Sequence, residues 1–343
     1  MVNVQWSMVN GQWSMVNGQW SMVLTFLFLL TSCDYKELCY DHRHYIDLKV
    51  IFDWQKSPDA DVAGMTVLYY SQTKPSTDPV RYDYTGMNGG TAQLTQDTYR
   101  AATYNYDTET ILYRNMQSAA TLEAYTRRST IEEGTRLATY TRGYPMPKAR
   151  GAEDEPVILE PDPLWATIGS DVELTQAVNP DVITLQPQPC TKHVNITINN
   201  VPNLEYTYDF GASLSGLSPS YKIAAHEPGN GTATEAFSMR VSGTSTLTGS
   251  LCIFGHCPHQ SGGDINQHIL TIYAILADGS KWYYSIDITD DMHKASEDPD
   301  IDEDEDINIE IAEEIPIPKP MTGDSGFVPT IDGWQSIEIN VDM

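Results

Sequence analysis

Cys33 is the residue whose surroundings point most directly to chemistry. It ends the run Leu30-Thr31-Ser32-Cys33, with an aliphatic residue three positions before the cysteine and a small residue directly before it. Small residues let a signal peptidase approach the bond, and the cysteine thiol receives a diacylglyceryl group. This lipobox pattern predicts that Cys33 carries a lipid; the alternative is an ordinary secreted chain with a chance cysteine.

The segment before Cys33 has the length of an export signal. Residues 22–30 are almost wholly apolar, as in the core of a signal peptide, and are too few to span a bilayer. Residues 1–21 are three tandem copies of a seven-residue unit without charge. We interpret 1–32 as a signal peptide with a repeated leader and 33–44 as a lipidated tether. Signal peptides normally begin with positively charged residues, and no Lys or Arg precedes Cys33. This departure puts the position of the translation start in doubt.

Two groups of cysteines and histidines could bind a metal. They are Cys39, His42 and His44, and Cys252, His256, Cys257 and His259. Structural zinc sites pair a closely spaced C-x₂₋₄-C with a second, distant pair, and neither group has that form. We therefore predict no metal site, and a disulfide or a buried thiol turn at Cys252 and Cys257. With Cys33 lipidated, four cysteines remain, which allow three pairings.

Residues 297–314 carry eleven carboxylates and no basic residue. Asp302, Asp304, Asp306 and Glu313 match positions one, three, five and twelve of a calcium loop, but Ile307 stands where that loop needs glycine to turn. Mutual repulsion favours an extended, hydrated segment, so we predict an acidic loop over 297–314.

Catalytic signatures are absent from the sequence. It contains no G-x-S-x-G, P-loop, H-E-x-x-H or dinucleotide motif, so we expect neither an enzyme nor a cofactor. The formal net charge of −27 argues against nucleic acid as a partner, because binding a polyphosphate needs clustered cations. The 20 tyrosines and 7 tryptophans leave sugar stacking on a sheet face open, although such residues are more often core residues.

The elements that must hold these residues are mainly short strands. Period-two alternation and β-prone runs predict strands over 45–54, 65–70, 99–106, 110–113, 192–198, 206–210, 236–241, 250–254, 269–276, 282–288 and 336–341. The remaining expectations are a short helix over 119–125 and a long exposed loop over 127–156. Pro187-Gln188-Pro189 marks a boundary between domains at 45–188 and 189–343, and the strands of the second domain favour a β-sandwich.

Several motifs together resemble one family. They are the lipobox, the stretch from Cys33 to His42, the strand leading to Trp54, Gly64-Met65-Thr66-Val67 and Asp332-Gly333-Trp334. The chain is similar in these to the fimbrial anchor-subunit lipoproteins of the Bacteroidales, and most similar to an uncharacterised branch grouped with them. The resemblance implies an all-β fold of two tandem transthyretin-like, Greek-key β-sandwich domains, and a lipid anchor in the outer membrane at the cell surface.

The resemblance also implies how the protein meets its partners. In that family, subunits associate by inserting a strand from one molecule into a groove of another, so that main-chain groups pair at an open sheet edge. The sequence therefore predicts a non-enzymatic anchor or accessory subunit of a fimbria whose partners are other fimbrial subunits. The alternative is a surface glycan-binding lipoprotein, on the basis of the aromatic content and the acidic surface.

Overall fold

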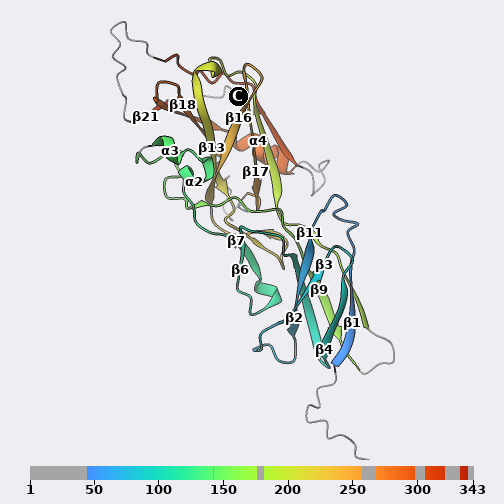
Figure 1. Cartoon of the computed structure of the whole chain (residues 1–343). Coiled ribbons are helices and arrows are strands. Elements are labelled where there is room, and N and C mark those ends of the chain that lie inside the picture. The colour runs from blue at the N-terminus through green and yellow to red at the C-terminus, as the bar shows by residue number, and fades with distance from the viewer. Residues whose placement is uncertain are drawn as a thin grey trace, which may run out of the picture. The chain divides into compact units, whose positions relative to one another are not determined.

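The computed structural model describes residues 45–141, 143–175, 181–256, 267–297, 306–320 and 333–338. Over these ranges the chain consists mostly of strands (Figure 1), which confirms the predicted all-β fold. The division into domains at residue 188 stays a prediction.

Two sheets enclose the first core. Their strand orders are β10-β1-β4 and β11-β9-β5-β2-β3. The bounds are β1 Tyr45–Phe52, β2 Gly64–Ser71, β3 Val80–Thr85, β4 Gly90–Thr95, β5 Thr98–Asn105, β9 Trp165–Glu173, β10 Asp181–Leu185 and β11 Gln188–Pro189.

Alternation along β1 explains this sandwich. Leu48, Val50 and Phe52 point into the core, and the residues between them are more exposed. Opposite them, Tyr69 of β2 is fully buried, and its hydroxyl lies 2.9 Å from the hydroxyl of Tyr84. Because buried polar atoms need partners, this pairing lets the two large side chains fill the core.

A second core lies on the other face of the five-stranded sheet, against a small sheet of order β15-β14-β7-β6. The bounds are β6 Ile111–Arg114, β7 Glu123–Thr126, β14 Ser220–Lys222, β15 Glu227–Pro228 and the 3-10 turn η1 Ala119–Thr121. The prediction of a helix over 119–125 is wrong beyond this turn. Leu122 and Ala124 are both buried in this core, a spacing of two that suits a strand paired with β6 and β14.

The largest sheet has nine strands in the described part of the chain. Its order is β20-β12-β17-β16-β13-β18-β19-β21, with β8 beside β16. The bounds are β8 Val157–Ile158, β12 Lys192–Ile198, η2 Leu204–Tyr206, β13 Thr207–Leu217, β16 Ala233–Ser242, β17 Thr246–Ile253, β18 Ile269–Leu276, β19 Lys281–Asp287, α4 Thr289–Glu297, β20 Ile307–Ile311 and β21 Trp334–Glu338.

One hydrophobic core unites both ends of this sheet. Ile196 of β12, Leu214 of β13 and Ile286 of β19 belong to the same buried cluster, so strands far apart in the sheet order face one another. Met292 of α4 belongs to the same cluster and is fully buried. The helix is therefore fixed to the sheet by its apolar face.

The segment 127–156 is folded, which corrects the prediction of a long exposed loop. It contains α2 Ile131–Thr135 and α3 Ala138–Thr141, which lie beside β13 in Figure 1. Ile131 and Leu137 are buried against Ala236 and Tyr273 on the outer face of the sheet. The sequence pattern missed these contacts because the apolar residues are widely spaced among Gly, Pro and charged residues.

The predicted acidic loop over 297–314 is wrong for residues 307–311. These form β20, which pairs in parallel with β12, and Ile307, Ile309 and Ile311 are buried in the main core. Asn308 and Glu310 alternate with them and are exposed. Burial of three isoleucines outweighs the repulsion between carboxylates that remain in water.

Candidate functional site

Most of the sequence-predicted site residues lie outside the described residues. These are the lipobox residues Leu30, Thr31, Ser32 and Cys33, the Cys39, His42 and His44 group, and Cys257, His259, Asp302 and Asp304. Lipidation and calcium binding therefore stay untested predictions. Cys252 is buried, and burial raises the pKa of its thiol to about 12. With Cys257 outside the described residues, the choice between a disulfide and a thiol turn stays open.

The clearest opening in the described part of the chain is a split between β16 and β17. The two strands pair from Ser242 with Thr246, next to their hairpin turn, as far as Met239 with Gly249, and the pairing ends at that last pair. Farther along β16, β8 runs beside Thr234 and Glu235 instead. The two strands thus diverge, and a groove of about 480 Å³ opens over the sheet.

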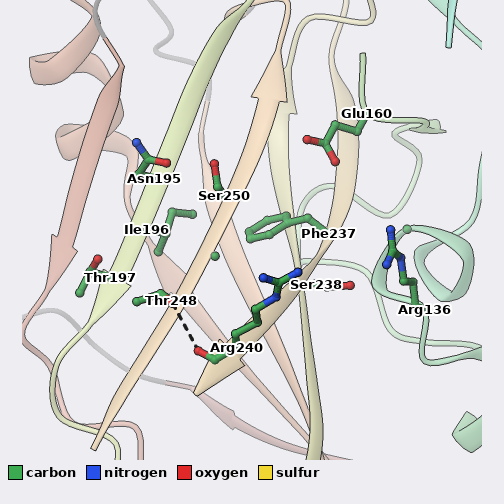
Figure 2. Close-up of a pocket in the computed structure, with 12 residues that line it drawn as sticks. Arg136, Glu160, Asn195, Ile196, Thr197, Phe237, Ser238, Arg240, Thr248 and Ser250 are labelled. Atoms are coloured by element: carbon green, nitrogen blue, oxygen red, sulfur yellow. Dashed lines mark hydrogen bonds between the residues drawn. The ribbon is translucent and has the colours of Figure 1, made fainter. Parts of the chain in front are cut away.

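Most of the residues that line this groove have polar side chains. Figure 2 shows Arg240, Thr248 and Ser250 on the neighbouring strands, with Glu160 at one side and Arg136 directly after α2. Ile196 and Phe237 supply the apolar part of the wall and belong to the main core. Hydroxyl, guanidinium and carboxylate groups around an apolar floor can hydrogen-bond a polar chain, and the described lining holds no nucleophile paired with a base.

Glu160 fixes the geometry of the split. Its Oε1 accepts a hydrogen bond of 2.8 Å from the backbone N–H of Cys252, on the part of β17 that has left β16. Desolvation raises the pKa of this carboxyl, and the hydrogen bond from Cys252 opposes that effect. A carboxylate thus takes the place that a strand carbonyl would occupy in a continuous sheet.

Glu235 lies deeper behind the same split. Its side chain is fully buried, and neither carboxyl oxygen has a hydrogen-bond partner within the described residues. Burial raises its pKa well above the usual value, and the nearby charge of Glu160 raises it further. A carboxyl group buried away from water has the lowest free energy in its neutral, protonated form.

The two outer strands of the large sheet form a second feature. β20 pairs in parallel with β12 at one end, and β21 pairs in parallel with β19 at the other. Both come from the last 40 residues of the chain, outside the hairpins that build the middle of the sheet. An outer strand added in this way covers main-chain groups that would otherwise be open to another strand.

Three histidines far apart in sequence also come together. They are His256, His268 and His293, whose ring nitrogens lie within 4.8 Å of one another. Sequence reasoning singled out His256 but grouped it with cysteines nearby in the chain. His268 and His293 were missed because only the fold brings the ends of β17 and β18 to α4.

The largest aromatic side chains of the described residues are mostly core residues. Tyr69, Tyr273 and Tyr284 are fully buried, and the groove has Phe237 as its aromatic wall. Tyr45 and Tyr208 are more than half exposed and lie in different sheets. The buried tyrosines follow the usual use of aromatic residues in cores.

In the described residues, every helix is too short or too polar to cross a bilayer. A curated protein from Bacteroides ovatus named "Putative fimbrium anchoring subunit Fim4B" is 31% identical over 106 residues, which is 30% of this chain and 30% of that protein. The matched part thus spans less than a third of the length of that relative. It confirms the resemblance to fimbrial anchor subunits that the sequence motifs indicated.

The fold is similar to that of a solved structure. A Bacteroides ovatus protein described as "a putative adhesin" has a TM-score of 0.59 at 19% identity, over 82% of this chain and 95% of the other. The fimbrial anchor protein Mfa2 from Porphyromonas gingivalis has a TM-score of 0.44 at 12% identity, over 76% and 88% of the two chains. Residues 32–238, more than half of the sequence, match the model of the Domain of unknown function (DUF5119), and the chain therefore belongs to that family.

Proposed function

We propose that this chain is a non-enzymatic cell-surface lipoprotein that serves as an anchor or accessory subunit of a fimbria. The anchoring subunit named among its relatives supports the fimbrial role, and the lipobox at Cys33 supports attachment to the outer membrane. The observation that carries the proposal is β21, a five-residue outer strand added in parallel to β19. We propose that β19 is the edge at which another subunit's strand is added.

The side chains of β21 reach both faces of the sheet. The Trp334 ring lies 5.5 Å from that of Tyr273 on the helix-covered face, and Ile337 packs against the main core. A strand that inserts side chains on both faces gains apolar contacts besides its main-chain hydrogen bonds. The edge of β19 therefore offers pockets as well as backbone partners.

The fit of β21 is incomplete. Trp334 Nε1 and Gln335 Nε2 are shielded from solvent, and neither has a hydrogen-bond partner in the described residues. A buried donor without a partner costs about 1–3 kcal/mol. A strand from another subunit that satisfies the same edge without this cost can replace β21.

A reversible lock on β21 tests the proposal. Tyr283 and Ser336 are register partners on β19 and β21, so Tyr283→Cys with Ser336→Cys places two thiols within disulfide reach. We expect the oxidised form to lose binding to fimbriae sheared from cells that lack this gene. The same protein, reduced and alkylated, should bind as the parent does.

The other end of the sheet provides a matched control. Asn195 on β12 and Asn308 on β20 are register partners whose side chains hydrogen-bond at 3.2 Å. Asn195→Cys with Asn308→Cys locks that edge instead, and the oxidised form should still bind. If both oxidised locks still bind, or if both lose binding, strand addition at β19 would be overturned.

The lipid anchor has its own test. Metabolic labelling with palmitate should mark the parent protein and leave Cys33→Ser unlabelled. The unlabelled variant should appear in the growth medium rather than in the outer membrane. Label on the Cys33→Ser protein would contradict acylation at this residue.

A surface glycan-binding lipoprotein is the second candidate, supported by the polar lining of the groove between β16 and β17. Affinity electrophoresis on a panel of polysaccharides tests it. Retardation by one polysaccharide that disappears in Arg240→Ala would favour this candidate. Unchanged migration across the panel would remove it.

A further inference from the structure

Three histidines from three elements converge at one end of the large sheet. His256 follows β17 and forms an isolated bridge with Leu217, His268 directly precedes β18, and His293 lies on α4. The ring centroids are 4.9 Å apart for His256 and His293, 5.2 Å for His268 and His293, and 5.8 Å for His256 and His268. All three rings thus face a common space.

His268 is held as a ligand would be. Its ring is fully buried, and Nδ1 lies 3.1 Å from the carbonyl oxygen of Ser215. A carbonyl only accepts hydrogen bonds, so Nδ1 carries the proton and Nε2 keeps its lone pair. Nε2 is shielded from solvent and has no hydrogen-bond partner in the described residues. Metal-binding histidines typically donate their second N–H to such a carbonyl, which fixes the ring.

The backbone around His268 is fixed as well. The N–H of His268 donates to Thr289 Oγ1 at 2.9 Å, and its carbonyl accepts from Ile288 at 2.9 Å. Gly216 has a φ of +79°, and a Cβ there would lie 2.9 Å from His268 Nδ1. The lack of a side chain at Gly216 thus lets the imidazole reach the main chain of β13.

Helix α4 presents the third ring. Met292 is buried in the main core, which fixes the rotation of the helix, and the neighbouring His293 is half-buried at the cluster. Asp287 Oδ1 accepts from the N–H of Thr289 at 3.0 Å and so satisfies a donor at the helix start. The histidine positions therefore depend on the two strand ends and the helix being packed together.

We propose that His256, His268 and His293 form a three-histidine site for a divalent transition metal ion, with Zn²⁺ as the ion that this chemistry fits best. Neutral imidazole is a preferred ligand of Zn²⁺, and three histidines with an open fourth position are an established zinc arrangement.

The geometry needs a modest adjustment. Tetrahedral Zn²⁺ with bonds of about 2.0–2.1 Å places ligand nitrogens about 3.4 Å apart, whereas the nitrogens here lie within 4.8 Å of one another. His268 is fixed, so the side chains of His256 and His293, both half-buried, must rotate and bring their ligand nitrogens inward by about 1 Å. The bound ion would then tie the end of β17 and the start of β18 to α4, and so stabilise this end of the fold.

Metal binding by the untagged protein tests the site. After metal removal and titration with Co²⁺, we expect one ion per chain with the visible d–d absorption of four- or five-coordinate cobalt, displaced by Zn²⁺. Zn²⁺ should also raise the melting temperature in a concentration-dependent way. His256→Gln, His268→Gln and His293→Gln should each lose the cobalt band and the melting shift.

His193→Gln is the matched control, because His193 lies exposed on β12. It should keep the band and the shift. Circular dichroism of the metal-free variants separates loss of binding from loss of fold, and a folded His268→Gln that binds Co²⁺ like the parent would overturn the proposal. The absence of any cobalt band in the parent protein would overturn it as well.

Discussion

Glu160 accepts a hydrogen bond of 2.8 Å from the backbone N–H of Cys252, 92 residues farther along the chain. This contact stands where β16 and β17 part, and it joins the segment after β8 to the large sheet. The amide of Cys252 has no strand partner on that side. The Glu160 carboxylate supplies the acceptor that this buried N–H needs where the two strands part.

Loss of the Glu160 carboxylate should destabilise the protein. Glu160→Ala leaves the amide of Cys252 without its acceptor, and we expect a loss of about 1–3 kcal/mol in the free energy of unfolding. Glu160→Gln keeps an acceptor of the same length and should lose clearly less. Urea unfolding at pH 7 measures both, and equal losses for the two variants would contradict the role of the hydrogen bond.

Glu235 should make stability depend on pH. The pKa of its buried carboxyl is raised well above the usual 4.5, so the folded protein holds this proton more tightly than the unfolded chain does. The stabilising effect is complete below pH 4.5 and is lost as the pH rises through the folded-state pKa. Glu235→Gln cannot ionise, so it should be more stable than the parent at pH 8, with the difference shrinking toward pH 4.5.

Thermal unfolding across this pH range checks the Glu235 prediction. Glu310→Gln is the control, because Glu310 is exposed on β20 and should leave the pH profile of the parent unchanged. A profile for Glu235→Gln that runs parallel to that of the parent at all pH values would show that Glu235 does not cause the slope.

Gly216 should tolerate no side chain. Its φ is +79°, and a Cβ would lie 2.3 Å from the carbonyl oxygen of Gln267. We expect Gly216→Ala to lower stability by about 2–4 kcal/mol, as the sum of backbone strain and a backbone clash. Gly243 has a nearly equal φ of +80° with nothing within 4 Å of its Cβ position, so Gly243→Ala measures the strain alone, at about 1 kcal/mol. Chemical denaturation in EDTA compares them, and similar losses would mean that no clash exists.

Strand β20, in the acidic region, should contribute to stability as part of the hydrophobic core. Ile309 is 3% exposed in the main cluster, so Ile309→Ala should cost about 2–5 kcal/mol. The neighbouring exposed Glu310→Ala should change stability by less than about 0.5 kcal/mol. Guanidinium unfolding of the two variants gives the comparison, and a small loss for Ile309→Ala would place β20 outside the cooperative core.

Strands whose pattern is local could be predicted from the amino-acid sequence. β1, β12 and β18 were predicted within about two residues of their bounds, because alternation or an apolar run marks a strand without reference to its partners. The family resemblance also came from the sequence, through short motifs between Leu30 and Trp334.

The tertiary structure alone decided which segments complete the sheets and what lies side by side. β20 was hidden by the carboxylates around it, and β7 looked helical, because burial against distant strands outweighs local charge and propensity. The Glu160 contact and the cluster of His256, His268 and His293 join residues that are 12 to 92 positions apart, and local patterns hold no information on such pairs. Their geometry is set by how the strands cross the core, which is a property of the packed chain as a whole.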